Sequence, residues 1–296
     1  MRKPREVTVA ATQMSCGWDR DANLERAEAL VREAAAGGAQ VILLPELFET
    51  PYFCIEQDSR HLRLATTLET NPAVAHFAPI ARELGVVLPI SFFERAGPAY
   101  FNSIAILDAD GTTLGVYRKA HIPNGPGYQE KNYFSPGDTG FRVWTTRFGR
   151  LGVGICWDQW FPETARVLAL QGAELLLFPT AIGTEPPPAL PVNSREHWQR
   201  TQQGHAAANL MPLIASNRYG VERSLQDPEG LYIRFYGSSF IADAFGAKVE
   251  EAGESEDAVL LHRFDLERTA ELRDNWFVFR DRRPDLYGPL LGLDGR

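Results

Sequence analysis

Cysteine is scarce in this sequence, which contains only Cys16, Cys54 and Cys156. An odd and sparse set does not form a disulfide framework, and the sequence has neither a CxxC pair nor zinc-finger spacing. No apolar run is close to the length of about 20 residues that a membrane-spanning helix needs. The first residues also lack the long apolar segment of a signal peptide. We therefore expect a cytoplasmic protein with reduced thiols and no membrane contact.

Positive charge is also in deficit, because 30 Lys and Arg residues stand against 38 Asp and Glu, a formal net charge of −8. Such a balance argues against nucleic acid as a partner and is compatible with a cationic small molecule. The 296 residues are 44% apolar, which is enough to fill a large core. The sequence contains no low-complexity stretch and no evident linker, so we expect a single domain over residues 1–296.

The order of the expected elements indicates an α/β fold. Residues 6–13 read as a strand, residues 19–40 as a helix with Asp21 as its N-cap and a stop at Gly37, and residues 41–46 as a buried strand. The same alternation returns later, with helices expected at 161–171 and 194–210 and buried strands at 173–180 and 211–217. This pattern predicts helices outside and sheets within.

The middle of the chain predicts shorter strands and two functional loops. Strands are expected at 86–94, 100–107 and 113–118, and the tetrad "DADG" between the last two is a hairpin turn. The segments 124–138 and 183–194 are rich in glycine, proline and asparagine. Long ordered loops in a compact domain usually serve function.

Three reactive side chains stand where apolar runs stop, namely Glu46, Lys119 and Cys156. Taken singly, each has an ordinary structural explanation, as a solvated charge or a small buried thiol. Cys156 is the most informative, because a strand-turn-helix would place it near a helix N-terminus. Unpaired N–H groups there favour a thiolate and can stabilise an oxyanion. We therefore interpret Cys156 as a nucleophile.

A cysteine nucleophile needs a base, and none of the six histidines stands in a known cysteine-protease signature. A buried glutamate is the next candidate, because desolvation raises its pKa while a nearby lysine lowers it. A Glu and Lys pair beside the thiol would supply both the base and a positive charge for the oxyanion.

Three segments, "PELFE", "YRKAHIP" and "GVGICWDQWFPE", resemble in order and separation the signatures of the nitrilase (carbon–nitrogen hydrolase) superfamily. The resemblance implies a four-layer αββα sandwich and a catalytic triad of Glu46, Lys119 and Cys156. It also assigns a supporting role to Glu130, which would otherwise read as a solvated loop charge. The chemistry of this superfamily requires no metal and no cofactor.

Further segments, among them "ELFETPYFC", "PTAIGTEP" and "FRDRRPDLY", resemble the branch that hydrolyses N-carbamoylputrescine to putrescine, ammonia and carbon dioxide in polyamine synthesis. Two alternatives stay open. One is a hydrolase of N-carbamoyl-β-alanine or another carbamoyl or aliphatic amide. The other is a catalytically inactive binding protein of the same fold.

The substrate of that branch carries an ammonium, whose burial requires an acidic partner. The sequence alone favours a solvated loop glutamate at Glu185, but the resemblance of "GTEP" to this branch makes Glu185 the candidate. Tyr52 and Trp157 are further candidates for substrate binding; Trp157, Trp160 and Phe161 could line the alkyl chain or belong to the core. The family resemblance also implies a homo-oligomer, with the segment from about 270 to 296 at a subunit interface.

Overall fold

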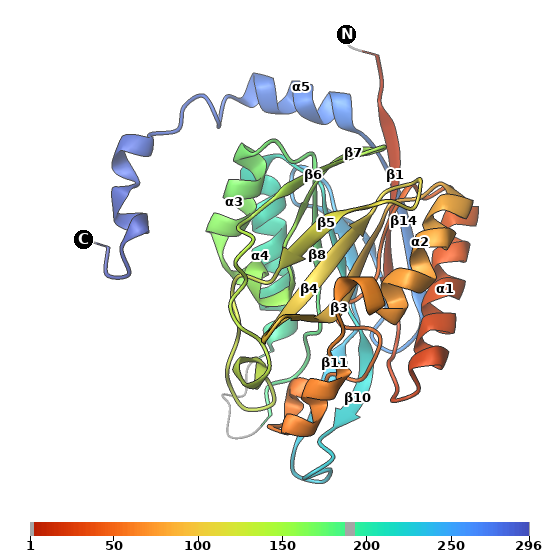
Figure 1. The fold of residues 1–296 in the computed structure, drawn as a ribbon. Coiled ribbons are helices and arrows are strands. Elements are labelled where there is room, and N and C mark those ends of the chain that lie inside the picture. Colours follow the sequence, from red (N-terminus) through yellow and green to blue (C-terminus); the bar gives the residue numbers. More distant parts are fainter. Residues whose placement is uncertain (1–2, 187–192, 296) are drawn as a thin grey trace.

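The computed structural model describes residues 3–186 and 193–295 and shows two sheets stacked face to face between two layers of helices (Figure 1). The first part of the chain forms β1 Glu6–Gln13, α1 Arg20–Ala36, β2 Val41–Leu43, α2 Pro72–Leu84, β3 Leu88–Ala96, β4 Ala99–Leu107 and β5 Thr113–Arg118. The second part forms β6 Val143–Thr146, β7 Gly149–Val153, α3 Pro162–Leu170, β8 Leu175–Pro179, α4 Ser194–Asn209, β9 Leu213–Ser216, β10 Tyr219–Arg223, β11 Tyr232–Tyr236, β12 Phe240–Ala242, β13 Lys248–Glu251, β14 Ala258–Asp265 and α5 Leu266–Trp276.

The two sheets have related topologies. In one, the order β14-β1-β2 continues into β3-β4-β5 through a parallel bridge between Val41 and Val87. In the other, the order is β13-β12-β9-β8-β7-β6, and β7, β8 and β9 run parallel. The helices α1, α3 and α4 make the crossovers that parallel neighbours require.

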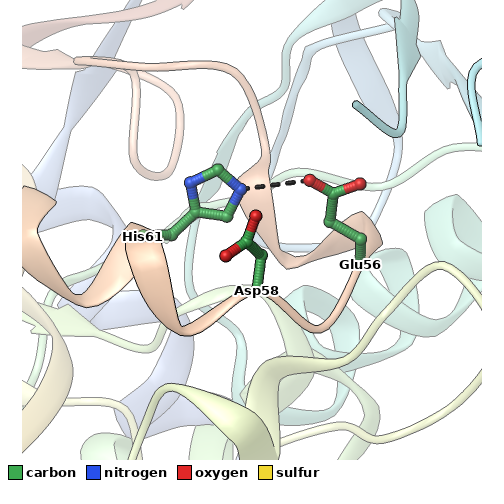
Figure 2. Close-up of side chains that lie close together, drawn as sticks. All are labelled: Glu56, Asp58 and His61. Atoms are coloured by element: carbon green, nitrogen blue, oxygen red, sulfur yellow. Dashed lines mark hydrogen bonds and ion pairs between the residues drawn. The ribbon is translucent and has the colours of Figure 1, made fainter. Parts of the chain in front are cut away.

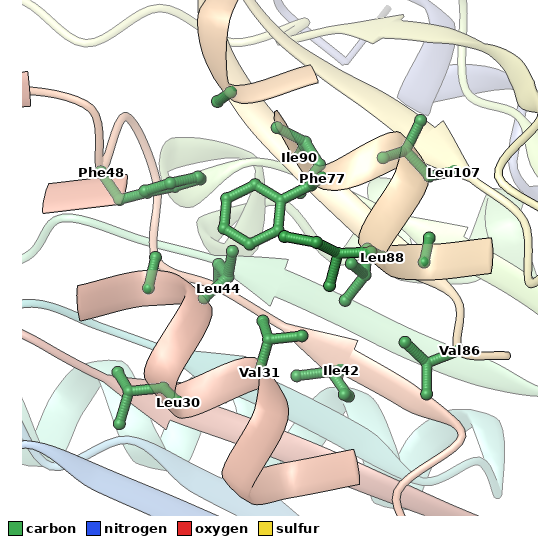
Figure 3. Packing of buried hydrophobic residues seen from close by; sticks show 14 of the residues in the cluster. Leu30, Val31, Ile42, Leu44, Phe48, Phe77, Val86, Leu88, Ile90 and Leu107 are labelled. Carbon is green, nitrogen blue, oxygen red and sulfur yellow. The ribbon is translucent and has the colours of Figure 1, made fainter. Parts of the chain in front are cut away.

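Strand alternation explains the four layers. In β1, Val9 and Ala11 point into the core between the two sheets, where Leu177 of β8 also lies. Ala10 points the other way, into the layer where α1 and α2 cover the first sheet. Figure 3 shows this helix–sheet layer, in which Val31 and Phe77 of the two helices lie near Leu88 and Ile90 of β3. A separate cluster joins α3 and α4 to the outer face of the second sheet.

The first βαβ unit has the expected order, with β1 over the predicted residues and β1 parallel to β2. The prediction of Asp21 as N-cap is wrong, because Asp19 holds that position and its carboxylate accepts from the Ala22 N–H at 3.1 Å. Asp21 lies in the first turn instead. The strand β2 stops at Leu43 rather than continuing to residue 46, since Pro45 has no N–H for a ladder bond.

The later elements follow the prediction within a few residues. The "DADG" turn joins β4 to β5, with Gly111 at φ 83° and its N–H donating to the Asp108 carbonyl at 2.8 Å. The loop 124–138 contains a single short 3₁₀ turn, Glu130–Asn132. Of the second predicted loop, residues 187–192 lie outside the described residues.

After α5, the C-terminal segment runs along the outside of the sandwich and ends away from it (Figure 1). Its leucines are unusually exposed, at 62% for Leu286, 65% for Leu290 and 93% for Leu291. Such a row of bare apolar side chains is the property expected of a contact surface. None of the described helices combines the length and the apolar character that crossing a bilayer requires.

Candidate active site

Glu46 lies fully buried in the turn that follows β2. This turn is strained, since Leu47 adopts φ 49°, a region that side chains other than glycine rarely enter. The buried Arg218 guanidinium supports it by donating to the carbonyls of Glu46 at 2.7 Å, Leu47 at 3.0 Å and Thr50 at 3.1 Å. Glu222, 2.8 Å from Arg218, balances its charge. These hydrogen bonds from Arg218 therefore fix the backbone of the turn that carries Glu46.

Lys119 follows β5 and is buried between two carboxylates. Its Nζ donates to Glu46 Oε1 at 2.9 Å and to Glu130 Oε1 and Oε2 at 2.9 and 2.7 Å. The Asn102 amide donates to Glu46 Oε1 at 2.7 Å, and the Tyr52 hydroxyl donates to Glu130 Oε1 at 2.7 Å. Within the described residues, Glu46 Oε2 has no hydrogen-bond partner. One buried carboxylate oxygen thus stays free to accept a proton.

The charges in this cluster perturb one another. Burial on its own lowers the pKa of Lys119, but Glu130 and Glu46 outweigh it and hold that pKa well above its ordinary value. Burial raises the pKa of Glu130 to about 7, against the opposing effect of Lys119 and with a further increase from Glu46. Lys119 therefore stays charged, while the Glu130 carboxyl is partly protonated near neutral pH.

Cys156 is the first residue of a short 3₁₀ turn, Cys156–Trp160, between β7 and α3, and adopts φ 41°. Burial raises the pKa of its thiol well above the ordinary value; Glu46 raises it further, and Lys119 lowers it by less. The expectation of a thiolate stabilised by a helix N-terminus is therefore wrong. A single 3₁₀ turn supplies too little positive potential to offset the loss of hydration, so the resting group is a neutral thiol that needs a base.

A cavity of about 180 Å³ lies beside the thiol. Its lining includes both reactive and apolar side chains from separate loops, among them Tyr128, Glu130, Cys156, Trp157, Trp160 and Glu185. Such a mixture of apolar walls with a few polar groups is typical of a small-molecule site. The cavity thus brings together Glu130, Cys156, Trp157 and Glu185, which were predicted from three distant segments of the sequence.

The predicted substrate-contacting residues take different positions. Trp157 is 39% exposed and lines the cavity together with Trp160. Phe161 lies elsewhere, stacked on the His121 ring with 3.7 Å between centroids. Tyr52 is not among the residues that line the cavity, and its hydroxyl donates a hydrogen bond to the Glu130 carboxylate. Its position supports that carboxylate rather than the substrate.

Glu185 is half-buried and lines the cavity. The segment that carries it is tied to the loop 124–138, since the Gly183 N–H donates to the Tyr128 hydroxyl at 3.0 Å. Gly183 also forms a bridge with Phe235 of β11, which fixes the chain two residues before Glu185. Glu185, the candidate partner for a substrate ammonium, therefore belongs to a segment that is held by hydrogen bonds to neighbouring elements.

Sequence reasoning missed Asn102, Tyr128 and Arg218. A signal for Asn102 exists, because it is an amide within the otherwise apolar strand "FNSIAIL" and is fully buried. Arg218 likewise stands two residues after the end of the buried strand β9. Buried polar groups require partners, but the sequence does not reveal which ones.

A second cluster of titratable side chains lies between β2 and α2, where Glu56, Asp58 and His61 approach one another (Figure 2). His61 Nε2 is 3.2 Å from Glu56 Oε1, and the other Glu56 oxygen accepts from the Gln226 N–H at 2.9 Å and from the Ser224 hydroxyl. Both Asp58 oxygens accept from a neighbouring arginine. These carboxylates are already satisfied by protein donors, so the cluster is structural.

The carbon–nitrogen hydrolase family model matches residues 8–274. An N-carbamoylputrescine amidase of Arabidopsis thaliana is 55% identical over 291 residues, which cover 98% of this chain and 97% of that protein. A citrullinase of Francisella tularensis subsp. tularensis is 51% identical, over 96% of this chain and 98% of that protein. The crystal structure of a carbon-nitrogen hydrolase from Helicobacter pylori G27 has a TM-score of 0.90 at 40% identity, over 97% of this chain and 99% of that one.

Proposed function

Because the chain belongs to the carbon–nitrogen hydrolase family, we propose that it is a thiol amidohydrolase that cleaves N-carbamoylputrescine to putrescine, ammonia and carbon dioxide. The observation that carries this proposal is a single cavity lined by the Cys156 thiol, the Glu130 carboxylate and the Glu185 carboxylate. The first two belong to a buried cluster suited to acyl transfer, and the third offers a partner for a cationic substrate. Putrescine formation places the enzyme in polyamine synthesis.

The first step is attack on the ureido carbon. Glu46 accepts the proton of Cys156 on Oε2, the oxygen without a protein partner. Because the thiol pKa is raised, proton transfer and attack proceed together rather than from a standing thiolate. Lys119 and the backbone N–H of Trp157 stabilise the oxyanion that forms on the carbonyl oxygen.

The second step expels the amine. Glu46 returns the proton to the leaving nitrogen, putrescine departs, and a carbamoyl group stays on the Cys156 sulfur. Glu46 then deprotonates a water that attacks this thioester and releases carbamate, which decomposes to ammonia and carbon dioxide. Glu130 keeps Lys119 in place throughout, which its two contacts with Nζ support.

Substrate choice follows from the charge of the cavity. N-carbamoylputrescine presents an ammonium at the end of an alkyl chain, for which Trp157 and Trp160 supply apolar contact and Glu185 a counter-charge. Citrulline and N-carbamoyl-β-alanine both carry a carboxylate, which in citrulline stands beside an ammonium. The lining holds Glu130 and Glu185 but neither arginine nor lysine among the described residues. A carboxylate there would meet like charge without a partner.

We further propose that the protein is a homo-oligomer and that the segment from about 270 to 296 forms part of a subunit interface. The exposed leucines of this segment, Leu286, Leu290 and Leu291, support this role. An apolar surface of this kind is stabilised when a second copy covers it.

A release assay tests the substrate directly, by following ammonia from N-carbamoylputrescine, citrulline and N-carbamoyl-β-alanine at equal concentration. We expect kcat/KM to be highest for N-carbamoylputrescine. Glu185→Gln should raise KM for it by about 30-fold or more, since removing one partner of a buried charge pair costs about 2–5 kcal/mol. An uncharged N-alkylurea of equal length is the matched control and should lose much less. Equal losses on both compounds would remove Glu185 from the ammonium site.

A further inference from the structure

One buried carboxylate near the site belongs neither to the cavity lining nor to the ion cluster. Asp158 is fully buried, and four donors saturate its two oxygens. Oδ2 accepts from the Tyr117 hydroxyl at 2.7 Å and the Ile155 N–H at 2.9 Å. Oδ1 accepts from the His121 N–H at 3.0 Å and from His121 Nδ1 at 2.8 Å. A carboxylate with all its acceptor positions filled has a fixed orientation.

These donors come from the two segments that carry the reactive side chains. Tyr117 and His121 lie two residues before and two residues after Lys119, so they hold this lysine on both sides. Ile155 directly precedes Cys156. The Asp158 carboxylate therefore links the segment that carries Cys156 to the segment that carries Lys119.

The nucleophile turn needs such a support. Cys156 adopts φ 41°, and a conformation of this kind persists only where its surroundings impose it. The approach is also tight, because a Cβ added at Gly154 would lie 3.2 Å from the Asp158 Cβ and 2.5 Å from the Phe178 ring. The backbone that leads into the 3₁₀ turn is thus packed closely against Asp158 and has little freedom while the carboxylate keeps its partners.

We infer that Asp158 is a positioning residue, which fixes the Cys156 sulfur relative to the Lys119 ammonium by holding Ile155 on one side and His121 and Tyr117 on the other. It touches neither the substrate nor the reacting atoms. The inference rests on the proposed role of Cys156 as nucleophile. A misplacement of about 1 Å between reacting groups costs about 100-fold in rate, so loss of this clamp acts on the chemical step.

Asp158→Asn is the principal variant. An amide presents one oxygen and one NH₂ group, so the donors on one side lose their acceptor and face another donor. We expect kcat to fall by about 100-fold while KM stays within about threefold, because Glu185 and the tryptophans are untouched. A role in stability alone would lower Tm and leave kcat at the wild-type value below Tm.

Tyr117→Phe is the second variant and decides the question if Asp158→Asn does not fold. Its matched control is Tyr133→Phe, which also removes a buried hydroxyl, one that donates to the Glu56 carbonyl at 2.6 Å and accepts from the Asp58 N–H at 2.8 Å. We expect both variants to have a lower Tm. Only Tyr117→Phe should also have a lower kcat, by about tenfold, because it loses a hydrogen bond to a charged group.

The closing experiment needs no knowledge of the substrate. Iodoacetamide alkylation of Cys156, followed by mass spectrometry across a pH series, measures how well Glu46 and Lys119 assist the thiol. We expect slower alkylation in Asp158→Asn and Tyr117→Phe, and the wild-type rate in Tyr133→Phe. Wild-type alkylation in the first two variants, or equal slowing in all three, would overturn the inference. If the wild type failed to cleave N-carbamoylputrescine, the proposed substrate would fall while this readout still decided the role of Asp158.

Discussion

Replacing Glu130 by glutamine should change how the stability of this protein depends on pH. The carboxyl is fully buried, and its pKa rises from 4.5 to about 7, mainly through burial. That difference corresponds to about 3 kcal/mol, at about 1.4 kcal/mol for each pH unit. Glutamine keeps the shape of the side chain and an acceptor for Lys119, but it does not titrate.

The direction in which stability changes with pH follows from the number of protons bound by the folded and the unfolded state. At pH values below the unfolded pKa, the carboxyl is protonated in both states and contributes nothing. Between 4.5 and about 7, the unfolded chain releases a proton that the folded protein retains, so the free energy of unfolding of the wild type falls as pH rises. The variant lacks this decline. The stability of Glu130→Gln relative to wild type should therefore improve by up to about 3 kcal/mol from about pH 5 to about pH 8.

Urea unfolding at several pH values and one protein concentration measures this difference, because the titrating groups distant from Glu130 cancel between the two proteins. Glu229→Gln, at an exposed loop position, is the matched control and should show a pH-independent difference. A constant difference for Glu130→Gln, or a variant that loses stability as pH rises, would refute the reasoning that burial dominates at Glu130.

The remaining predictions concern the other site residues and the assembly. Glu46→Gln should bind substrate and fail to turn it over, since its amide oxygen still accepts from Lys119 and Asn102 but nothing replaces the proton-accepting Oε2; a normal kcat would exclude Glu46 as the base. Lys119→Ala should be inactive and less stable, because it leaves two buried carboxylates without a cation, and activity above a few per cent of wild type would contradict its oxyanion role. Deleting the residues after Arg280 should lower the mass measured by light scattering, whereas an unchanged mass would place that segment on a free surface.

Much of the fold could be predicted because strand and helix periodicity determine it locally. The β1–α1–β2 unit illustrates this, since its alternating valines and helical leucines assign faces as well as elements. Its N-cap could not be chosen between Asp19 and Asp21, because both carry a carboxylate and only the backbone conformation separates them. Boundaries at residues such as Pro45 depend on which ladder bonds the neighbouring strands require.

The active site was likewise predictable in part from the sequence. The side chains Glu46, Lys119 and Cys156 stand at strand ends, where their order along the chain makes them visible. Their electrostatics could not be predicted, since the raised thiol pKa arises from burial that only the packed structure produces. The roles of Arg218 and Asp158 were equally hidden, because Arg218 binds carbonyls of residues 46–50 and Asp158 binds groups of Tyr117 and His121, all distant in sequence.

The central claim is that Cys156 is the nucleophile, and paired alanine variants test it most directly. Cys156 and Cys54 are both buried thiols, so Cys156→Ala and Cys54→Ala remove the same group from neighbouring parts of the core. Ammonia release from N-carbamoylputrescine should vanish in the first and persist in the second, with both proteins folded by circular dichroism. Turnover by Cys156→Ala within about tenfold of wild type, which is a loss of only about 1.4 kcal/mol, would contradict the account.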